Sequence, residues 1–263
     1  MDPNQLLLEV TALAREAGRA ILEVYASSFS VQEKEDRSPL TEADLRSEKL
    51  ILAGLKRIAP EIPVLSEESA QAPYSTRRNW SRLWVVDPLD GTKEFVQRNG
   101  EFTVNIALVD SQRPVLGIVH APALERTYYA SEGVGAFRSD AEATGKPIRV
   151  AKQRHSPLRV VGSRSHRGSS LDAFLARVGP HELVEVGSSL KLCLVAEGQA
   201  DVYPRLGPTS EWDTAAGQCV LEQAGGQVLK LDGEPLEYNR ENTLNPNFIG
   251  FADADTNWLA LVK

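Results

Sequence analysis

Apolar residues recur at helical spacing in the first quarter of the chain. Between residues 6 and 24 they fall every three or four positions, as in an amphipathic helix, and Asp2 and Pro3 supply a cap and a first turn. A second stretch with the same period follows Thr41 and stops before Pro60, which cannot continue a helix. The pattern predicts two helices, each with one apolar face.

Short apolar runs predict strands further along. Runs at 62–65, 83–86, 104–108, 115–119 and 127–130 indicate an antiparallel or mixed sheet under the two helices. From about residue 150 strands and helices alternate, with strands at 158–161 and 183–186, helices at 171–178 and 190–196, a helix from near Thr214 and a hairpin at 228–231. We therefore expect an α/β protein with an α+β part at 1–150 and an α/β part at 151–263, packed together with a cleft between them.

Composition narrows the class of protein. With 263 residues, of which 42% are hydrophobic and 25% charged, the chain can bury a large core without a disulfide or a structural metal. The net charge of -7 argues against binding to a nucleic-acid polymer, which needs clustered Lys and Arg. An anionic substrate would instead need bound cations, and surplus carboxylates are what would hold them.

Cysteine spacing and the N-terminal residues bear on the compartment. Cys193 and Cys219 form no CxxC pair, and the four histidines lack the spacing of zinc ligands. The first residues carry no basic leader, and Glu9 and Arg15 interrupt the apolar positions that follow. We expect a cytoplasmic protein without a transmembrane segment.

The segment from Asp87 to Thr92 is the first candidate for chemistry. Asp87 and Asp90 lie three residues apart around Pro88, and Gly91 lets the backbone turn sharply. An ordinary β-turn would explain this hexapeptide equally well. Both readings stay open for the segment taken alone.

Two further acids favour a metal site. Glu67 follows the apolar run at 62–65, and Asp213 stands at a predicted helix start. Four carboxylates at the ends of elements can converge on one cleft, where they would repel one another unless divalent cations were present. Mg²⁺ prefers carboxylate, water and phosphate oxygens. The acids Glu67, Asp87, Asp90 and Asp213 therefore predict a magnesium site.

Capping offers a competing role for several of these residues. Asp213 is also a candidate N-cap, and Thr41 to Asp44 form a capping box that would by itself account for Asp44. Another predicted helix start carries Ser188, Ser189 and Lys191, which suit either the binding of an anion or simple capping of the helix. His166 and Arg205 are candidate donors to a second phosphate, although scattered basic residues are often only solvated surface.

Three ordered motifs resemble a known family. Ser66-Glu67-Glu68, then Trp84 to Thr92, then Trp212 to Gly217 resemble the inositol monophosphatase superfamily of lithium-sensitive, magnesium-dependent phosphatases. Within it, segments 38–41, 91–95, 98–105, 187–191 and 194–200 are most similar to the bacterial 3'(2'),5'-bisphosphate nucleotidases of sulfate assimilation, the CysQ type. The resemblance covers nearly the whole chain.

The resemblance implies a layered αβαβα fold and hydrolysis of 3'-phosphoadenosine 5'-phosphate to AMP and phosphate, or of its 5'-phosphosulfate analogue. It makes residues 1–150 the metal-binding part and residues 151–263 the substrate-binding part. It implies these metal ligands: Glu67, Asp87, Asp90, Asp213 and the Leu89 carbonyl. Thr92 and Asp44 would orient and deprotonate the attacking water. The implied substrate contacts are Glu67, Leu89, Asp90, Gly91, Thr92, His166, Ser188, Ser189, Lys191, Arg205 and Asp213.

Rival functions remain at this point. An inositol-phosphate phosphatase would share the metal site, although Lys93-Glu94 after Thr92 favours the nucleotide. A metal and phosphate sensor without turnover would be expected to lack a ligand, and none is missing. A nicotinamide site is disfavoured because Gly133-Val134-Gly135 lacks a third glycine, and no nucleophile elbow supports serine hydrolysis. Monomer or homodimer, and peripheral contact with the inner face of the cell membrane, stay open.

Overall fold

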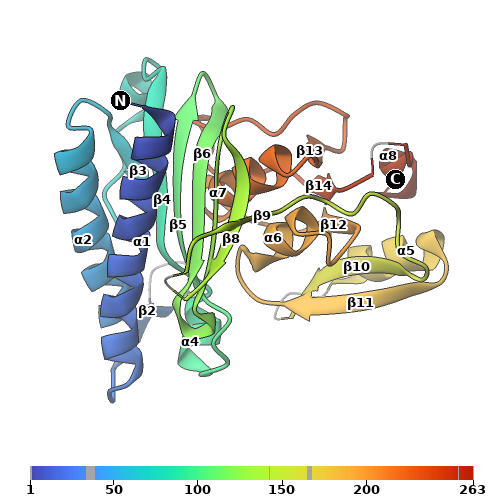
Figure 1. Cartoon of the computed structure of the whole chain (residues 1–263), viewed down its shortest axis with the longest axis horizontal. Coiled ribbons are helices and arrows are strands. Elements are labelled where there is room, and N and C mark those ends of the chain that lie inside the picture. The colour runs from blue at the N-terminus through green and yellow to red at the C-terminus, as the bar shows by residue number, and fades with distance from the viewer. Residues whose placement is uncertain (1, 34–38, 142, 165–167, 254, 263) are drawn as a thin grey trace.

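Helical and β layers alternate across the molecule in five layers (Figure 1). The computed structural model describes residues 2–33, 39–141, 143–164, 168–253 and 255–262. In order, the layers are α1 (Pro3–Tyr25) with α2 (Glu42–Ile58), a seven-stranded sheet, α6 (Leu190–Ala196) with α7 (Glu211–Gln223), a five-stranded sheet, and α5 (Ser169–Val178) with α8 (Trp258–Val262). The α/β class and the αβαβα order are thus confirmed.

The two sheets differ in strand direction. The larger sheet runs, edge to edge, β3 (Val64–Ser66), β4 (Arg82–Asp90), β5 (Thr103–Asp110), β6 (Arg113–Ala121), β7 (Arg126–Ser131), β8 (Gly135–Asp140) and β9 (Lys146–Pro147). Only its β3–β4 pair is parallel among the described strands. The smaller sheet runs β11 (His181–Val186), β10 (Leu158–Ser163), β12 (Val202–Arg205), β14 (Phe248–Phe251) and β13 (Gln227–Lys230).

Short elements complete the chain. They are β1 (Val31–Glu33), β2 (Pro39–Thr41), α3 (Tyr74–Arg77), α4 (Thr92–Val96) and a 3₁₀ turn at Pro122–Leu124. Of these, α4 begins two residues after Asp90, and α3 begins seven residues after Glu67.

The first two helices begin and pack as their sequence dictates. Asp2 caps α1 by accepting a hydrogen bond from the amide of Gln5 at 3.3 Å. Thr41 and Asp44 form the expected capping box at the start of α2. The apolar faces of both helices cover one face of the larger sheet, where Trp84, among others, is fully buried.

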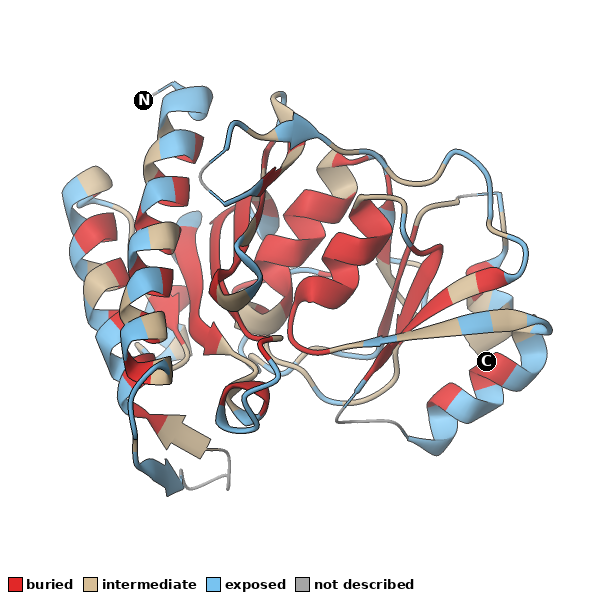
Figure 2. Ribbon diagram, turned by 60° about the horizontal axis from the view of Figure 1, so that its bottom comes forward, coloured by how far each residue is buried: buried red, intermediate tan, exposed pale blue. Residues whose placement is uncertain are grey.

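Two helices fill the space between the sheets. All seven residues of α6 are buried, and most of α7 is buried as well, which Figure 2 shows as red helices between the sheets. A methyl group on Gly117 of β6 would lie 2.5 Å from the carbonyl oxygen of Ala216, so α7 packs directly on the larger sheet. The last strand of the larger sheet ends at residue 147, and the first strand of the smaller sheet begins at residue 158. Helix α7 comes after this point in the sequence, yet it packs on the larger sheet, which comes before it. The two-part division at residue 150 stays a prediction.

Several short elements escape the sequence pattern. Strands β8, β12 and β14 and helix α8, each four to six residues long, were not predicted. The expected hairpin at 228–231 is reduced to a turn: β13 pairs with β14, and the chain turns at Gly233, where the Leu229–Pro235 bridge and a 2.8 Å hydrogen bond from Lys230 N to Glu234 O close it.

Two expectations about the compartment can be compared with the structure. Among the described residues, no helix combines the length and apolarity needed to cross a bilayer. Cys193 and Cys219 are buried and unbonded to each other.

Gly18 gives a test of how α1 is seated. A Cβ at this position would lie 2.5 Å from the ring of His120, which is buried and fixed by a 3.0 Å hydrogen bond between Nδ1 and the hydroxyl of Thr127. We expect Gly18→Ala to lower the free energy of unfolding by about 1–3 kcal/mol, as overpacking does. Urea denaturation measures this change. Helix propensity alone predicts the opposite, a gain of roughly 1 kcal/mol, so a stabilised variant would contradict the packing argument.

Candidate active site

A β-bulge at the end of β4 places two carboxylates together. Asp87 pairs with Asn105 of β5, and Asp90 pairs with Thr103, so three steps on β4 match two on β5. In a regular strand, residues three apart point to opposite faces, and one extra residue restores them to the same face. The amide of Leu89 donates to Asp87 Oδ1 at 3.0 Å within this bulge. The segment that sequence alone left as a possible turn is therefore a bulge that aims both acids inward.

Two other elements bring further carboxylates to this point. Carboxylate oxygens of Glu67, after β3, of Asp87 and of Asp213, in the first turn of α7, all lie within 4.8 Å of one another. The amide of Glu67 donates to Val86 O at 3.2 Å, which fixes it beside β4. Asp213 also accepts a hydrogen bond from the Ser210 amide at 2.8 Å. Asp213 therefore both caps the start of α7 and belongs to the carboxylate cluster.

Burial makes this cluster electrostatically costly without a cation. Asp87 is 1% exposed, and desolvation first, then Glu67, Asp90 and Asp213, hold its pKa well above the usual range. Desolvation and the neighbouring acids raise the pKa of Asp213 to about 8. Asp90 is raised less, to a pKa of about 6, because Lys191 opposes desolvation.

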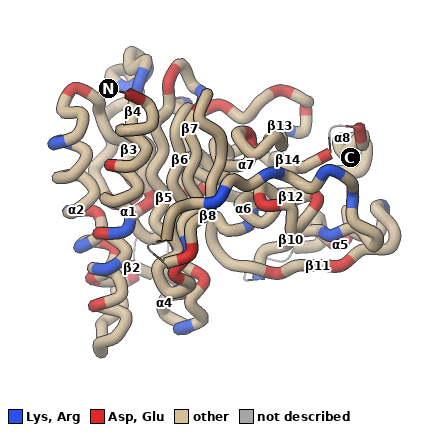
Figure 3. Tube along the Cα trace, viewed as in Figure 1, with Lys and Arg blue, Asp and Glu red and all other residues tan. Residues whose placement is uncertain are grey.

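The carboxylates of Asp87 and Asp90 lie beside strands of the larger sheet that are otherwise uncharged. Strands β5 and β6, the next two in the sheet after β4, carry Asp, Glu, Lys or Arg only at their ends, at Asp110 and Arg113. The middle parts of both strands are tan in Figure 3. Charged groups inside a sheet are rare unless paired or metal-bound. The residues present therefore fit a hard divalent cation, since the cluster offers only oxygen donors and a cation would offset the repulsion.

Thr92 and Asp44 meet beside the bulge. Thr92 is the first residue of α4, and its Oγ1 is 3.2 Å from Asp44 Oδ1 and 3.3 Å from the Leu89 carbonyl oxygen. The other carboxylate oxygen of Asp44 accepts from the Thr41 amide at 2.8 Å. Asp44 is 1% exposed, so the cap rigidly orients the oxygen that faces Thr92. Capping and contact with Thr92 thus coexist.

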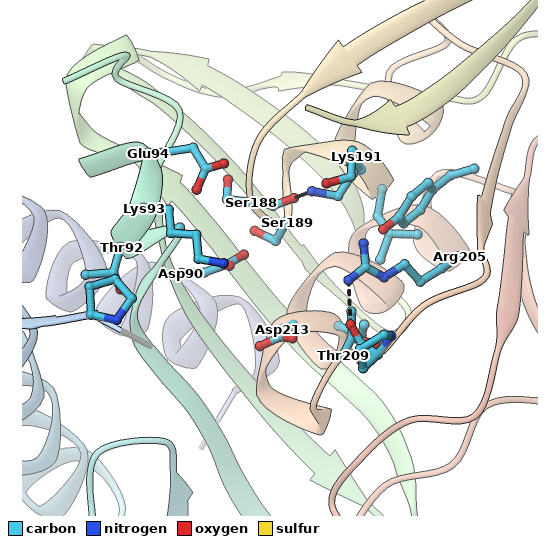
Figure 4. A pocket seen from close by; sticks show the side chains of 17 residues that line it. Asp90, Thr92, Lys93, Glu94, Ser188, Ser189, Lys191, Arg205, Thr209 and Asp213 are labelled. Atoms are coloured by element: carbon cyan, nitrogen blue, oxygen red, sulfur yellow. Dashed lines mark hydrogen bonds between the residues drawn. The ribbon is translucent and has the colours of Figure 1, made fainter. Parts of the chain in front are cut away.

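A pocket of about 280 Å³ opens next to these residues (Figure 4). Thr92 and Lys93 lie on one side and Lys191 and Arg205 on the other, with Ser188 and Ser189 between them. Eight predicted substrate contacts line it: Asp90, Gly91, Thr92, Ser188, Ser189, Lys191, Arg205 and Asp213. Of the other three, Glu67 and Leu89 are not part of its lining, and His166 lies outside the described residues.

The serine pair at the centre of the pocket has contrasting surroundings. Ser189 Oγ donates to Asn105 Oδ1 at 2.7 Å and lies 2.9 Å from Thr103 Oγ1, which ties α6 to β5. Ser188 is 8% exposed, has a positive φ of 47°, and its hydroxyl has no hydrogen-bond partner among the described residues. An unpaired buried hydroxyl in a pocket wall is available to a ligand.

Two basic residues define the far side of the pocket. Lys191 is buried, its Nζ donates to the Ser188 carbonyl, and desolvation lowers its pKa to about 8 despite the attraction of Asp90. Arg205 donates to the carbonyl oxygens of Gly207, at 3.2 Å, and Pro208, which fixes its guanidinium at the pocket edge.

Sequence reasoning missed part of the lining. The additional residues are Pro39, Lys93, Glu94, Ser163, Leu192, Tyr203, Pro208, Thr209 and Thr214. Some lie beside predicted residues, as Glu94 does two positions after Thr92 and Tyr203 two before Arg205. Pro39 is the first residue of β2 and lies in segment 38–41, which carried part of the family resemblance, whereas Thr209 comes from a loop that carried no signal.

Fold and site together define a class: the metal-dependent phosphatases, with a buried carboxylate cluster beside a pocket that has basic groups on its far side. The chain belongs to the inositol monophosphatase family, whose model matches residues 2–259. This confirms the family resemblance expected from the three motifs.

Individual relatives narrow the comparison. A protein of Salmonella typhimurium strain LT2, named 3'(2'),5'-bisphosphate nucleotidase CysQ, is 50% identical over 246 residues, covering 92% of this chain and 98% of that protein. Its Escherichia coli K12 namesake is 49% identical over the same length, with the same shares of both chains covered. The crystal structure of CysQ from Bacteroides thetaiotaomicron matches with a TM-score of 0.85 at 42% identity, covering 95% of this chain and 98% of that one. The expected CysQ type is thus confirmed.

The carboxylate cluster predicts an unusual response to Asp87→Asn. Because the folded-state pKa of Asp213, about 8, lies above its ordinary value of 3.8, the metal-free protein should lose stability as pH rises between them. The same cost applies to Asp87, whose pKa is also held well above its usual range by desolvation and by the neighbouring acids, and a neutral asparagine at this position avoids it. We expect the variant in EDTA at pH 7 to be more stable than the wild type, by about 1–3 kcal/mol, and no longer stabilised by added divalent cation.

Urea unfolding with EDTA and then with MgCl₂ measures both effects. Asp110→Asn is the matched control, because Asp110 is half-exposed and paired with Arg82 at 3.1 Å, where the loss is about 0–1 kcal/mol. An Asp87→Asn protein that is less stable than the wild type in EDTA would show that the acids do not repel one another as argued.

Proposed function

We propose that the chain is a 3'(2'),5'-bisphosphate nucleotidase that uses Mg²⁺ to hydrolyse the 3'-phosphate of 3'-phosphoadenosine 5'-phosphate, or of its 5'-phosphosulfate analogue. The observation that carries this proposal is the two-ended pocket: Asp90 and Asp213 stand at one end, and Lys191 and Arg205 at the other. A substrate with two phosphates can place one at each end. The names of the CysQ relatives support the same substrate.

The reacting phosphate belongs at the carboxylate end. The acids Glu67, Asp87, Asp90 and Asp213, with the Leu89 carbonyl, would hold the magnesium there. Bound Mg²⁺ would supply the positive charge that neutralises phosphate oxygens and stabilises the departing ribose oxygen.

Thr92 and Asp44 prepare the attacking water. The Thr92 hydroxyl donates to Asp44, so its own lone pairs can accept a hydrogen bond from water. The water oxygen attacks phosphorus as the bond to the 3'-oxygen breaks. The proton of the water passes through Thr92 to Asp44, and the ribose oxygen leaves with a proton from solvent. The amides of Gly91 and Thr92 would orient the phosphate.

The second phosphate belongs at the basic end. Lys191 and Arg205 supply positive charge, and Ser188, whose buried hydroxyl has no partner among the described residues, lines the same pocket. Ser189 is committed to Asn105 and shapes the wall. His166 stays a predicted contact. In this scheme residues 1–150 supply most metal ligands, and residues 151–263 most of the substrate contacts.

The remaining assignments follow from this function. We place the enzyme in the cytoplasm, where its nucleotide substrate would arise, acting as a monomer or homodimer; peripheral contact with the inner face of the membrane is compatible with it. Sensitivity to lithium belongs to the same proposal.

Phosphate release from two substrates tests the proposed activity. With MgCl₂ present, we expect 3'-phosphoadenosine 5'-phosphate to be hydrolysed at least roughly 100-fold more efficiently than inositol 1-phosphate, because only the nucleotide places charge at Lys191 and Arg205. EDTA should abolish release from both. A preference for inositol 1-phosphate would retain the metal site but reject the nucleotide, and no release from either substrate would favour a sensor.

A hydroxyl swap tests the water-orienting role. Thr92→Val keeps the shape of the side chain but removes the hydroxyl, and we expect kcat for the nucleotide to fall by about 10²–10³-fold. Thr92→Ser, which retains the hydroxyl, is the matched control and should stay within about tenfold of the wild type. Equal kcat values for the valine and serine variants would remove Thr92 from the mechanism.

A further inference from the structure

Arg77 carries a charge yet is 3% exposed. Its Nε donates to the Ala72 carbonyl at 3.1 Å, and Nη1 donates to Asn239 Oδ1 at 3.0 Å and to the Arg240 carbonyl at 3.2 Å. Nη2 donates to the Glu241 carbonyl at 3.4 Å. Burying a guanidinium is unfavourable unless its donors are satisfied, and here acceptors from two distant segments satisfy them.

Asn239 returns the contact. Its Nδ2 donates to the Arg77 carbonyl at 2.8 Å and to the Trp80 carbonyl at 3.3 Å, so the two residues bind each other through side chain and backbone. Its φ of 59° lies in the left-handed region, which asparagine tolerates better than most residues. The side chain is buried, at 5% exposure. The pair therefore fixes the loop at 239–241 against α3.

Glu211 connects the same loop to α7. Its fully buried carboxylate accepts from the Asn239 amide at 2.7 Å and from the Arg240 amide at 2.9 Å, and it lies 3.4 Å from Arg240 Nε. Its own amide donates to the Thr243 carbonyl at 2.9 Å. We refer to Arg77, Asn239 and Glu211 as the buried hub.

Both ends of the buried hub lead to the carboxylate cluster. On one side, Arg77 holds Ala72, at the end of the segment that starts with Glu67. On the other side, Glu211 is the first residue of α7 and Asp213 lies in the same turn. None of the three hub residues is among those that line the pocket or form the cluster. The hub thus joins the backbones that carry two cluster acids.

We infer that the buried hub is a set of positioning residues that fixes the separation of the Glu67 and Asp213 carboxylates and thereby sets the affinity for the divalent cation. The inference rests on the proposed function, in which this cluster holds Mg²⁺. Mg²⁺ demands near-ideal octahedral geometry, so small displacements of a ligand weaken binding. Residues that orient ligands without touching the metal typically contribute 10- to 100-fold in affinity.

Two hub variants test it by calorimetric titration of the substrate-free protein with MgCl₂. Asn239→Gly removes the amide but suits the left-handed backbone, and Arg77→Lys keeps the charge but loses the forked donors. We expect the Kd for Mg²⁺ to rise about tenfold or more in each. Saturating MgCl₂ should restore kcat for 3'-phosphoadenosine 5'-phosphate to within about twofold of wild type, because the hub does not contact substrate.

Gly18→Ala controls for loss of stability, since its neighbours His120 and Pro122 lie outside both hub and cluster. Its Kd for Mg²⁺ should equal that of the wild type. Unchanged Mg²⁺ affinity in both hub variants, or an equal loss in Gly18→Ala, would overturn the inference alone. If the wild type binds Mg²⁺ but does not hydrolyse the nucleotide, the proposed function fails while the affinity comparison still decides the role of the hub. A wild type that binds no Mg²⁺ would overturn both.

Discussion

Mutual repulsion between buried carboxylates is the constraint around which the site is built. Glu67, Asp87 and Asp213 come from three separate elements, yet their oxygens lie within 4.8 Å of one another, with Asp87 buried and the other two partly buried. Like charges at this range favour protonation of one or more groups, unless a cation is bound. Packing in the rest of the fold must therefore hold the three carboxylates in place until a cation binds.

That packing comes from the layer between the sheets. Helix α7 carries Asp213 and is held on the larger sheet by close contact with Gly117, where any side chain would collide. Asp87 and Asp90 are held by β4, a strand paired on both sides, and by the bulge that redirects its last residues. These rigid elements hold the acids together against their mutual repulsion, which loops alone would not do.

The long periodic elements and the convergence of Glu67, Asp87 and Asp213 could be predicted from the sequence, whereas most of the short elements could not. Helices α1 and α2 were recognisable because their apolar residues repeat over many turns. Asp87 and Asp90 were recognisable because they flank Pro88. The bulge was not, since a bulge and a turn use the same residues. Strand β14 was missed because Gly250 interrupts its short apolar run. The hub was missed because Arg77 and Asn239 read as ordinary surface residues until distant segments meet.

Placement of α7 between the sheets has a consequence for how the protein is made on the ribosome. The inner face of the seven-stranded sheet is completed by residue 147, but α7, which covers it, ends only at Gln223. During translation the apolar face of the sheet therefore stays uncovered while more than seventy further residues are synthesised. This takes about 4–15 s at 5–20 residues per second. The nascent chain is exposed to aggregation and to chaperones through that interval, and the carboxylate cluster is complete only when it ends.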